Sequence, residues 1–97
     1  MSIGYVLLLS EEKYYIGISE HLDLRLSQHF SGEGATWTKR YPPIQLIETF
    51  PGSKINEKQK TMEMMKLHGW KNCRGGGWTG INIKQPLFLR DGAPANP

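Results

Sequence analysis

Two tyrosines stand ten positions apart in a predicted β-hairpin. Tyr5 lies in the apolar stretch of residues 4–9, and Tyr15 lies in the aromatic and β-branched stretch of residues 14–19. The polar residues between these stretches indicate a turn, although it lacks the Asn-Gly pair that gives the strongest hairpin signal. In such a hairpin both phenols can project into one shallow surface, and Gly17 leaves room there for a neighbouring group or ligand. We therefore expect the hairpin to form the floor of a site.

The helix expected after the hairpin places two more polar side chains on one face. Apolar residues recur there at every fourth position, which predicts a helix over Leu22–Phe30 whose apolar stripe packs on the sheet. Arg25 and His29 are also four positions apart, so they share a different face of this helix. On spacing alone, a solvated surface is the simpler interpretation of these two side chains.

A second helix is predicted over Ser53–His68, and it carries two glutamates of interest. Ser53 suits the start of this helix and Gly69 suits its end. Glu57 lies in the first turns, where the helix dipole favours a negative charge, whereas Glu63 lies deeper, among methionines. Taken alone, each glutamate is also consistent with an ordinary solvated residue.

Two glycine-rich segments carry basic and aromatic side chains that could contact a polyanion. Residues 31–43 are predicted to form a loop, in which Lys39 and Arg40 could follow a phosphate backbone while aromatic rings stack on a splayed base. Arg74 precedes three glycines, whose backbone can approach a phosphate closely. The alternative for both segments is structural, with rings that cap the core in the first and a tight turn in the second.

Length and composition indicate one small domain. The 97 residues predict a domain over residues 1–85 followed by a tail over residues 86–97. Twelve basic and nine acidic residues give a net charge of +3, which permits a polyanionic partner without requiring one. A single cysteine excludes an internal disulfide, and the apolar run of residues 6–9 is too short for a signal peptide or a membrane span. We expect a soluble intracellular protein with no membrane association.

The predicted fold class is α/β, of the α+β kind, with a small three-stranded antiparallel sheet flanked by helices. Apolar residues on roughly alternate positions predict the third strand, which Pro51 and Gly52 end. The three strands are Gly4–Leu9, Tyr14–Ser19 and Ile44–Phe50. Residues 81–83 are expected to add a short edge strand or an extended arm.

These residues together resemble the GIY-YIG nuclease family. Ile3-Gly4-Tyr5 and Tyr15-Ile16-Gly17 are similar to the two tripeptides of that family, with the order changed to Ile-Gly-Tyr in the first. The resemblance covers about residues 3–83 and includes an arginine ten positions after the second tyrosine, a histidine one helical turn later, a glutamate and an asparagine. Here these residues are Arg25, His29, Glu57 and Asn72.

The resemblance implies a metal-dependent DNA endonuclease that hydrolyses phosphodiester bonds. Glu57, rather than Glu63, would bind a single Mg²⁺ or Mn²⁺ ion, and Arg25 would hold the phosphate oxygens as charge builds on them. Tyr5 would act as general base toward water, alone or relayed by His29, and Tyr15 would position water or phosphate. The residues expected to contact DNA are Lys13, Thr38, Lys39, Arg40, Asn72 and Arg74. No cofactor other than the metal ion is expected.

The same resemblance leaves a second function open, that of a nucleic-acid-binding module that keeps the fold without the chemistry. Such a module would be expected to have lost a key residue, whereas Tyr5, Arg25 and Glu57 are all present. Because no separate reading domain is expected, sequence specificity would come from the loop of residues 36–41, from a homodimer or from a partner protein.

Overall fold

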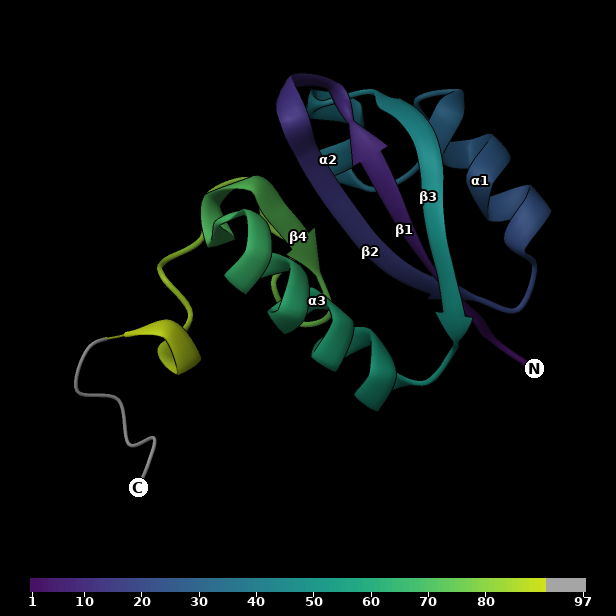
Figure 1. Cartoon of the computed structure of the whole chain (residues 1–97). Coiled ribbons are helices and arrows are strands. Elements are labelled where there is room, and N and C mark those ends of the chain that lie inside the picture. Colours follow the sequence, from purple (N-terminus) through teal and green to yellow (C-terminus); the bar gives the residue numbers. More distant parts are fainter. Residues whose placement is uncertain (91–97) are drawn as a thin grey trace.

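A four-stranded sheet lies between helices on its two faces in the computed structural model, which describes residues 1–90 (Figure 1). The strands are β1 (Ile3–Leu9), β2 (Lys13–Ser19), β3 (Pro43–Pro51) and β4 (Cys73–Gly75), in the order β3-β1-β2-β4. The helices are α1 (Leu22–Phe30), α2 (Thr36–Arg40) and α3 (Lys54–His68), and the short 3-10 turns are η1 (Ser10–Glu12), η2 (Trp70–Asn72) and η3 (Leu87–Leu89). The predicted α+β class is confirmed.

The predicted hairpin of β1 and β2 forms the two central strands of the sheet. The two strands pair antiparallel with Tyr5 opposite Gly17, and β1 also pairs antiparallel with β3. The expectation of three strands is wrong, because β4 adds a fourth strand that pairs parallel with β2 at Tyr14–Ile16. This strand is short, contains glycine and pairs across a long stretch of sequence, so no local periodicity announces it. Residues 81–83 form no strand.

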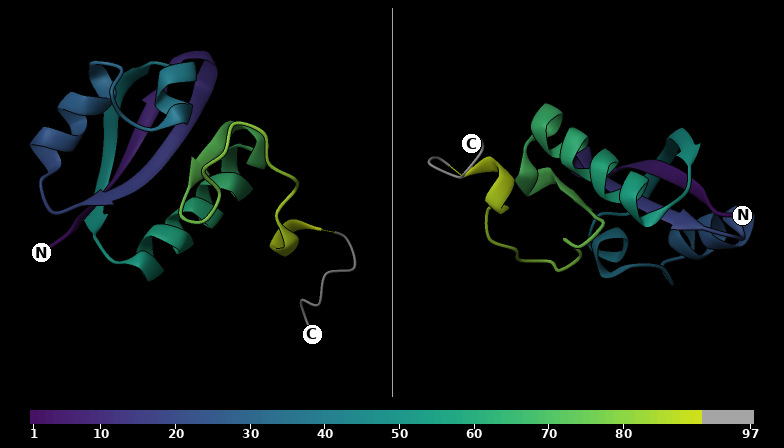
Figure 2. Two further views of the ribbon diagram at one scale, coloured as in Figure 1. Left: turned by 180° about the vertical axis from the view of Figure 1, so that it is seen from behind. Right: turned by 90° about the horizontal axis from the view of Figure 1, so that it is seen from below.

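Two clusters of apolar side chains hold the layers together, one on each face of the sheet. The right-hand view of Figure 2 shows α3 on one face and α1 with α2 on the other. The cluster on the α1 and α2 side contains Tyr5, Leu7, Leu9, Tyr15 and Trp37. The cluster on the α3 side contains Val6, Ile16, Met64, Met65 and Cys73. Alternate residues of β1 therefore serve opposite layers, as the two-residue period of a strand requires.

The helices follow their predicted bounds closely, with one addition. Ser53 caps α3, because its hydroxyl accepts a hydrogen bond from the backbone N–H of Asn56 at 3.0 Å, and Gly69 ends the helix with a φ of +92°. Residues 36–40, expected to lie in a loop, form α2 instead. The buried indole of Trp37 donates to the carbonyl oxygen of Tyr14 at 3.0 Å, so a tertiary contact stabilises this short helix despite the glycines and prolines around it.

The apolar stripe predicted for α1 is only partly correct. Leu22 and Leu26 pack against the cluster on their face of the sheet, but Phe30 is 50% exposed. His29, expected to share a polar face with Arg25, is fully buried in its place. A buried imidazole requires hydrogen-bond partners, and the site supplies them.

The end of the described chain turns back onto the domain. Pro86 is buried, and the ring centroid of Phe88 lies 5.6 Å from that of Trp78. The expected tail over residues 86–97 falls mostly outside the described residues, so the boundary after residue 85 stays a prediction. Within the described part of the chain, no helix has the length and apolar character needed to cross a membrane.

Candidate active site

Three rings from β1, β2 and α1 meet on the sheet face below α1. The ring centroids of Tyr5 and Tyr15 lie 6.3 Å apart, and that of His29 lies 5.6 Å from Tyr5 and 5.1 Å from Tyr15. Tyr5 and Tyr15 come from adjacent strands of the hairpin. His29 comes from α1, and its ring packs against both tyrosines. The structure thus brings together three residues from three different elements.

Two glycines make room for these rings. A Cβ atom on Gly17 would lie 2.5 Å from the phenolic oxygen of Tyr5 and 2.6 Å from its Cζ atom, so the phenol crosses β2 where no side chain stands. A Cβ atom on Gly34 would collide with Nδ1 of His29. Gly17 was expected to leave such room, whereas nothing in the local pattern pointed to Gly34.

A chain of hydrogen bonds fixes the proton positions on His29. The hydroxyl of Thr38 donates to the carbonyl oxygen of Ala35 at 2.9 Å, so its oxygen accepts from Nδ1–H of His29 at 3.0 Å. With its proton on Nδ1, the neutral imidazole accepts at Nε2 from the hydroxyl of Tyr5, at 2.8 Å. Tyr5 therefore points its proton at His29 and keeps its oxygen lone pairs for another partner.

Burial sets the charge states of this chain. Burial, together with a smaller effect of the positive charge of Arg25, lowers the pKa of His29 to about 4, so the imidazole is neutral at neutral pH. Burial also raises the pKa of Tyr5, with a smaller contribution from Tyr15, so its phenol stays protonated. The resting site thus holds a protonated phenol hydrogen-bonded to an unprotonated imidazole nitrogen.

Arg25 and Glu57 have opposite effects on the pKa values of both phenols. The guanidinium of Arg25 lowers the pKa values of Tyr5 and Tyr15, and the carboxylate of Glu57 raises both, although burial has the largest effect on each. Arg25 is half-buried, and one of its terminal nitrogens donates to Oε1 of Gln28 at 3.0 Å. All five residues predicted to be catalytic therefore lie within electrostatic reach of one point on the sheet.

The short β4 leaves a gap through which the charge of Glu57, on α3, can act on phenols on the opposite face of the sheet. β4 pairs with β2 only as far as Ile16, so β4 leaves the edge of β2 at Gly17 uncovered. Gly75 lets α3 pack closely beside that point, because a Cβ atom there would collide with the carbonyl oxygen of Ile16 and lie 2.9 Å from Oγ1 of Thr61. Thr61 in turn donates to the carbonyl oxygen of Glu57 at 2.7 Å. The first turns of α3 thus lie beside the gap.

The donor set around Glu57 fits a hard divalent cation that keeps most of its water. Burial raises the pKa of this half-buried carboxyl, and Lys54 opposes that effect. Among residues 1–90, no Lys, Arg or His side chain forms an ion pair with Glu57, and no group of three His, Cys, Asp or Glu side chains could hold a metal ion. A single carboxylate with water and substrate phosphate is the way in which Mg²⁺ is commonly bound.

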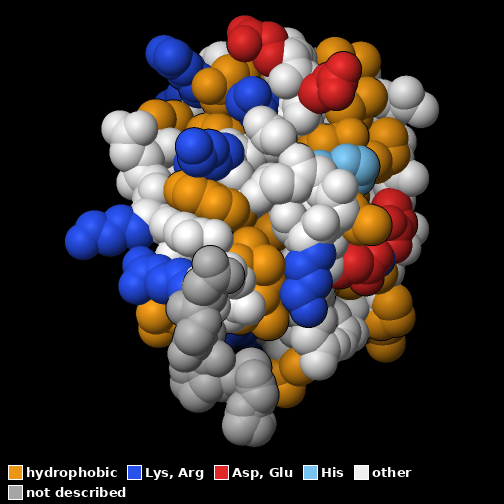
Figure 3. Space-filling view, turned by 60° about the vertical axis from the view of Figure 1, so that its left-hand side comes forward, with side chains coloured by type: hydrophobic (Ala, Val, Ile, Leu, Met, Phe, Trp, Pro, Cys, Tyr) orange, Lys and Arg blue, Asp and Glu red, His pale blue; other side chains and the backbone are white. Residues whose placement is uncertain are grey.

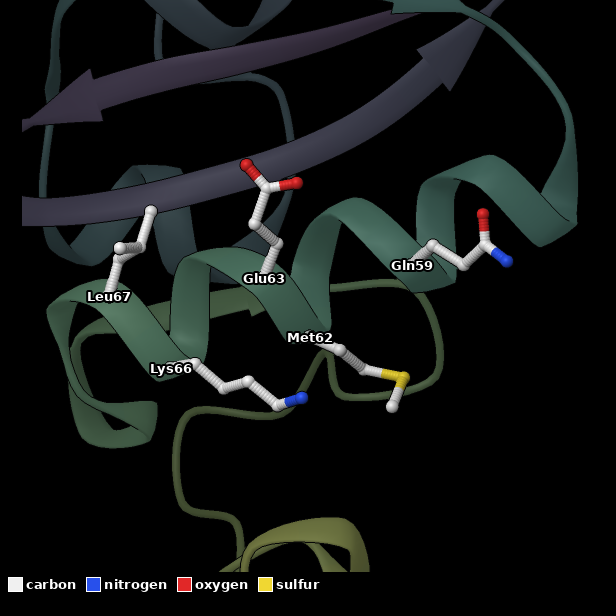
Figure 4. A pocket seen from close by; sticks show the side chains of 5 residues that line it. All are labelled: Gln59, Met62, Glu63, Lys66 and Leu67. Carbon is white, nitrogen blue, oxygen red and sulfur yellow. The ribbon is translucent and has the colours of Figure 1, made fainter.

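Glu63, the competing carboxylate, lies elsewhere. It pairs with Lys60 at 3.2 Å and lines an open groove of about 580 Å³ along α3, together with Gln59, Met62, Lys66 and Leu67 (Figure 4). Its charge is not among the influences on either phenol. Of the two carboxylates, Glu57 is thus the one whose charge acts on the phenols, and Glu63 is paired with Lys60.

The residues expected to contact DNA divide into two groups. Lys39 and Arg40 are exposed on α2, and the amine of Lys13 lies 5.1 Å from the ring centroid of Tyr41. The other three have partners within the protein: Thr38 holds His29, Asn72 donates to the carbonyl oxygen of His68 at 2.8 Å, and Arg74 is only 4% exposed. In Figure 3 Lys and Arg side chains lie among hydrophobic ones across the face that turns toward the viewer.

Comparison with known proteins places this arrangement in a family context. A family model described as the GIY-YIG catalytic domain matches residues 1–71. A UPF0213 protein of Xanthomonas axonopodis pv. citri is 38% identical over 47 residues, which make up 48% of this chain and 46% of that protein. The UPF0213 protein YsiG of Lactococcus lactis is 32% identical over 76 residues, 70% of this chain and 73% of that protein. The chain thus spans about half the length of the Xanthomonas relative. No solved structure matches the chain significantly.

Proposed function

The chain belongs to the GIY-YIG family, a family of nuclease-type catalytic domains, and from this we propose that it is a divalent-metal-dependent DNA endonuclease. The observation that carries the proposal is that the hydrogen-bonded pair of Tyr5 and His29 is under the influence of a positive and a negative side chain. Tyr5 donates to Nε2 of His29, and Arg25 and Glu57 both act on Tyr5. Proton acceptor, phosphate anchor and metal ligand are the three functions that hydrolysis of a phosphodiester needs.

In the proposed reaction a water molecule attacks the phosphorus and the bond from phosphorus to the 3′ oxygen breaks. The attacking water gives a proton to the phenolic oxygen of Tyr5, while the phenolic proton moves to Nε2 of His29, and the departing 3′ oxygen takes up a proton from solvent. Arg25 binds the non-bridging phosphate oxygens as negative charge builds on them. Thr38 keeps Nδ1 protonated, so Nε2 is always the nitrogen that accepts.

Glu57 is the residue proposed to hold the metal ion, Mg²⁺ or Mn²⁺. The bound ion would supply charge neutralisation at the scissile phosphate and at the departing 3′ oxygen. Tyr15, whose pKa is raised mainly by burial, stays protonated and is proposed to position the phosphate or water through its hydroxyl.

Cleavage of supercoiled plasmid DNA with Mg²⁺, with Mn²⁺ and with a chelator tests this proposal. We expect nicking that requires the metal and that falls about a hundred- to ten-thousandfold in Tyr5→Phe, the range that a general acid or base contributes. Tyr14→Phe is the matched control, because the Tyr14 ring stacks on His68 at 4.3 Å and packs with the cluster on the α3 side. Equal cleavage by both variants would contradict the assignment of Tyr5.

The same assay separates the enzyme from a nucleic-acid-binding module. A protein that binds the plasmid but leaves it uncut with either metal ion would support the module instead. A protein that cuts equally well with a chelator would contradict the metal-dependent mechanism.

A further inference from the structure

A cavity that has Trp37 in its wall combines flat rings with positive charge. It has a volume of about 310 Å³ and is lined by residues of α2 and η2 and by the segment of residues 81–83. Its rings belong to Trp37, Tyr41 and Trp70, and its cations to Arg40, Lys71 and Arg74. Trp37 belongs to the same apolar cluster as Tyr5 and Tyr15, so this wall of the cavity stands on the face of the sheet that carries the catalytic site.

Arg74 gives this cavity a buried charge without a counter-ion. The side chain is 4% exposed, and it donates to backbone carbonyl oxygens of Trp70, Lys71, Cys73, Gly80 and Ile81. All these acceptors are neutral, and within residues 1–90 no aspartate or glutamate forms an ion pair with Arg74. The cavity lining holds no acidic residue either. The carbonyl oxygens take up its hydrogen bonds, so Arg74 adds positive potential to the cavity, while the exposed Arg40 and Lys71 are the cations that can contact a phosphate.

The rings differ in how much surface they leave free. The indole of Trp37 already has two neighbours, because the guanidinium of Arg74 lies over it at 4.1 Å and Tyr41 meets it edge-on at 4.7 Å. Tyr41 and Trp70 are only half-buried. Arg40 lies 5.7 Å from the ring of Tyr41, and Lys71 lies 5.7 Å from the ring of Trp70. Both rings are half-buried and carry a cation over the ring, on an exposed side chain that a base can displace toward its own phosphate.

We propose that this cavity binds one unstacked nucleotide of the strand that the catalytic site cuts, with its base against Trp70 and Tyr41 and its phosphate against Arg40 and Lys71. Its volume lies at the lower end of ligand pockets, which measure roughly 300–1,000 Å³, and suits one nucleotide rather than a duplex. The inference rests on the proposed function and deepens it. Because paired bases are held inside a duplex, the preferred substrate carries unpaired nucleotides next to the scissile phosphate.

Binding of defined DNA probes, followed by fluorescence anisotropy with a chelator present, tests this inference. The probes are a blunt duplex, the same duplex with a five-nucleotide unpaired extension at one end or the other, and the extended duplexes with abasic residues in the extension. We expect one extension to raise the affinity about tenfold or more and its abasic version to lose most of that gain, since the gain comes from base stacking. Equal affinity for blunt and extended probes, or no binding to any probe, would overturn the inference.

Two tryptophans provide a matched pair of variants. Trp70→Leu should lose the preference for the extended probe while it binds the blunt duplex like the wild type. Trp78→Leu is the control, because both tryptophans pack against the same cluster but Trp78 lines a different cavity, with Lys58 and Phe88. Should either tryptophan variant fail to fold, Lys71→Ala and Lys66→Ala replace the pair, because both lysines are exposed and only Lys71 lines the cavity. Equal effects within the pair would contradict the proposed site.

Cleavage of the same probes, measured with Mg²⁺, allows the nucleotide site and the endonuclease proposal to be tested independently. A protein that prefers extended probes but cuts none of them would contradict the endonuclease proposal alone. A protein that cuts blunt and extended probes at the same rate, with equal affinity, would contradict the nucleotide site alone.

Discussion

At the scale of single residues, the site depends on a buried histidine whose two nitrogens have different roles. Nδ1 of His29 donates to Thr38, and Nε2 accepts from Tyr5. Because Thr38 uses its own proton on the carbonyl of Ala35, it can only accept from the imidazole. Full burial disfavours the imidazolium, so the imidazole keeps Nε2 free for the proton of Tyr5 over the whole neutral range.

The depressed pKa of His29 predicts a loss of stability at mildly acidic pH. The folded pKa is about 4, below the ordinary value of 6.5, so between these values the unfolded chain binds a proton that the native imidazole does not. Its contribution to stability is complete above pH 6.5 and is lost as the pH falls toward 4. From pH 7 to pH 4.5 the loss should be on the order of 2–3 kcal/mol. Urea unfolding at both pH values measures it.

The variant His29→Gln isolates this contribution from the titration of the carboxylates. Glutamine does not titrate, so the variant should be less stable than wild type at pH 7 but should lose less stability on going to pH 4.5. Parallel pH profiles for the two proteins would contradict the assignment of a buried neutral imidazole.

At the scale of elements, glycines allow the hairpin and α1 to pack closely enough to form the site. A side chain at these positions would collide with a ring of the site. Gly17 in β2 is the clearest case, because the phenol of Tyr5 occupies the space of its missing Cβ atom. Gly17→Ala should therefore displace Tyr5 and lower the cleavage rate by about a hundredfold, the effect expected when a catalytic group moves by about 1 Å. The overall fold should persist, which far-ultraviolet circular dichroism would verify.

Gly77→Ala is the matched control for the close contact at Gly17. A Cβ atom on Gly77 would meet nothing within 4 Å, so this variant should cut DNA at the wild-type rate. Wild-type cleavage by Gly17→Ala would show that the position of the Tyr5 ring is not critical.

The elements that the sequence predicts well are those with local signals. Alternation and β-branched residues identified β1, β2 and β3, and the cap residues Ser53 and Gly69 marked the ends of α3. By contrast, β4 exists because Gly75 fits against Ile16 of a distant strand, and α2 forms because Trp37 reaches the backbone of Tyr14. Such contacts join residues that are distant in the sequence, so the periodicity of the local sequence does not predict them.

The site itself was predictable as a set of residues but not as a hydrogen-bonding network. The resemblance named the five proposed catalytic positions, but it assigned Thr38 to DNA contact, whereas this hydroxyl is 1% exposed and holds His29. Arg74 was likewise expected to contact DNA from a glycine-rich segment, whereas the structure buries it against the ring of Trp37. A side chain's partner across the fold decides its role in both cases.

At the scale of the whole molecule, a modest positive charge predicts DNA binding that depends on salt and not on sequence. With about four phosphate contacts, the logarithm of the binding constant should fall with a slope of about −4 against the logarithm of salt concentration. Lys39→Ala should reduce that slope by about 1, because its side chain is exposed on α2. Lys66→Ala, on the outer side of α3, should leave the slope unchanged. A single preferred recognition site in a digest of a long DNA by the purified protein would contradict this prediction.

The rate of plasmid cleavage by Glu57→Gln, compared with that by Glu63→Gln, tests the central claim most directly. The amide keeps the size of the side chain but is a far poorer ligand for Mg²⁺, so Glu57→Gln should cut slower by several orders of magnitude while it binds DNA at least as tightly. Glu63→Gln should cut near the wild-type rate, because Glu63 pairs with Lys60 away from the tyrosines. Wild-type cleavage by Glu57→Gln, with or without a loss in Glu63→Gln, would contradict the account.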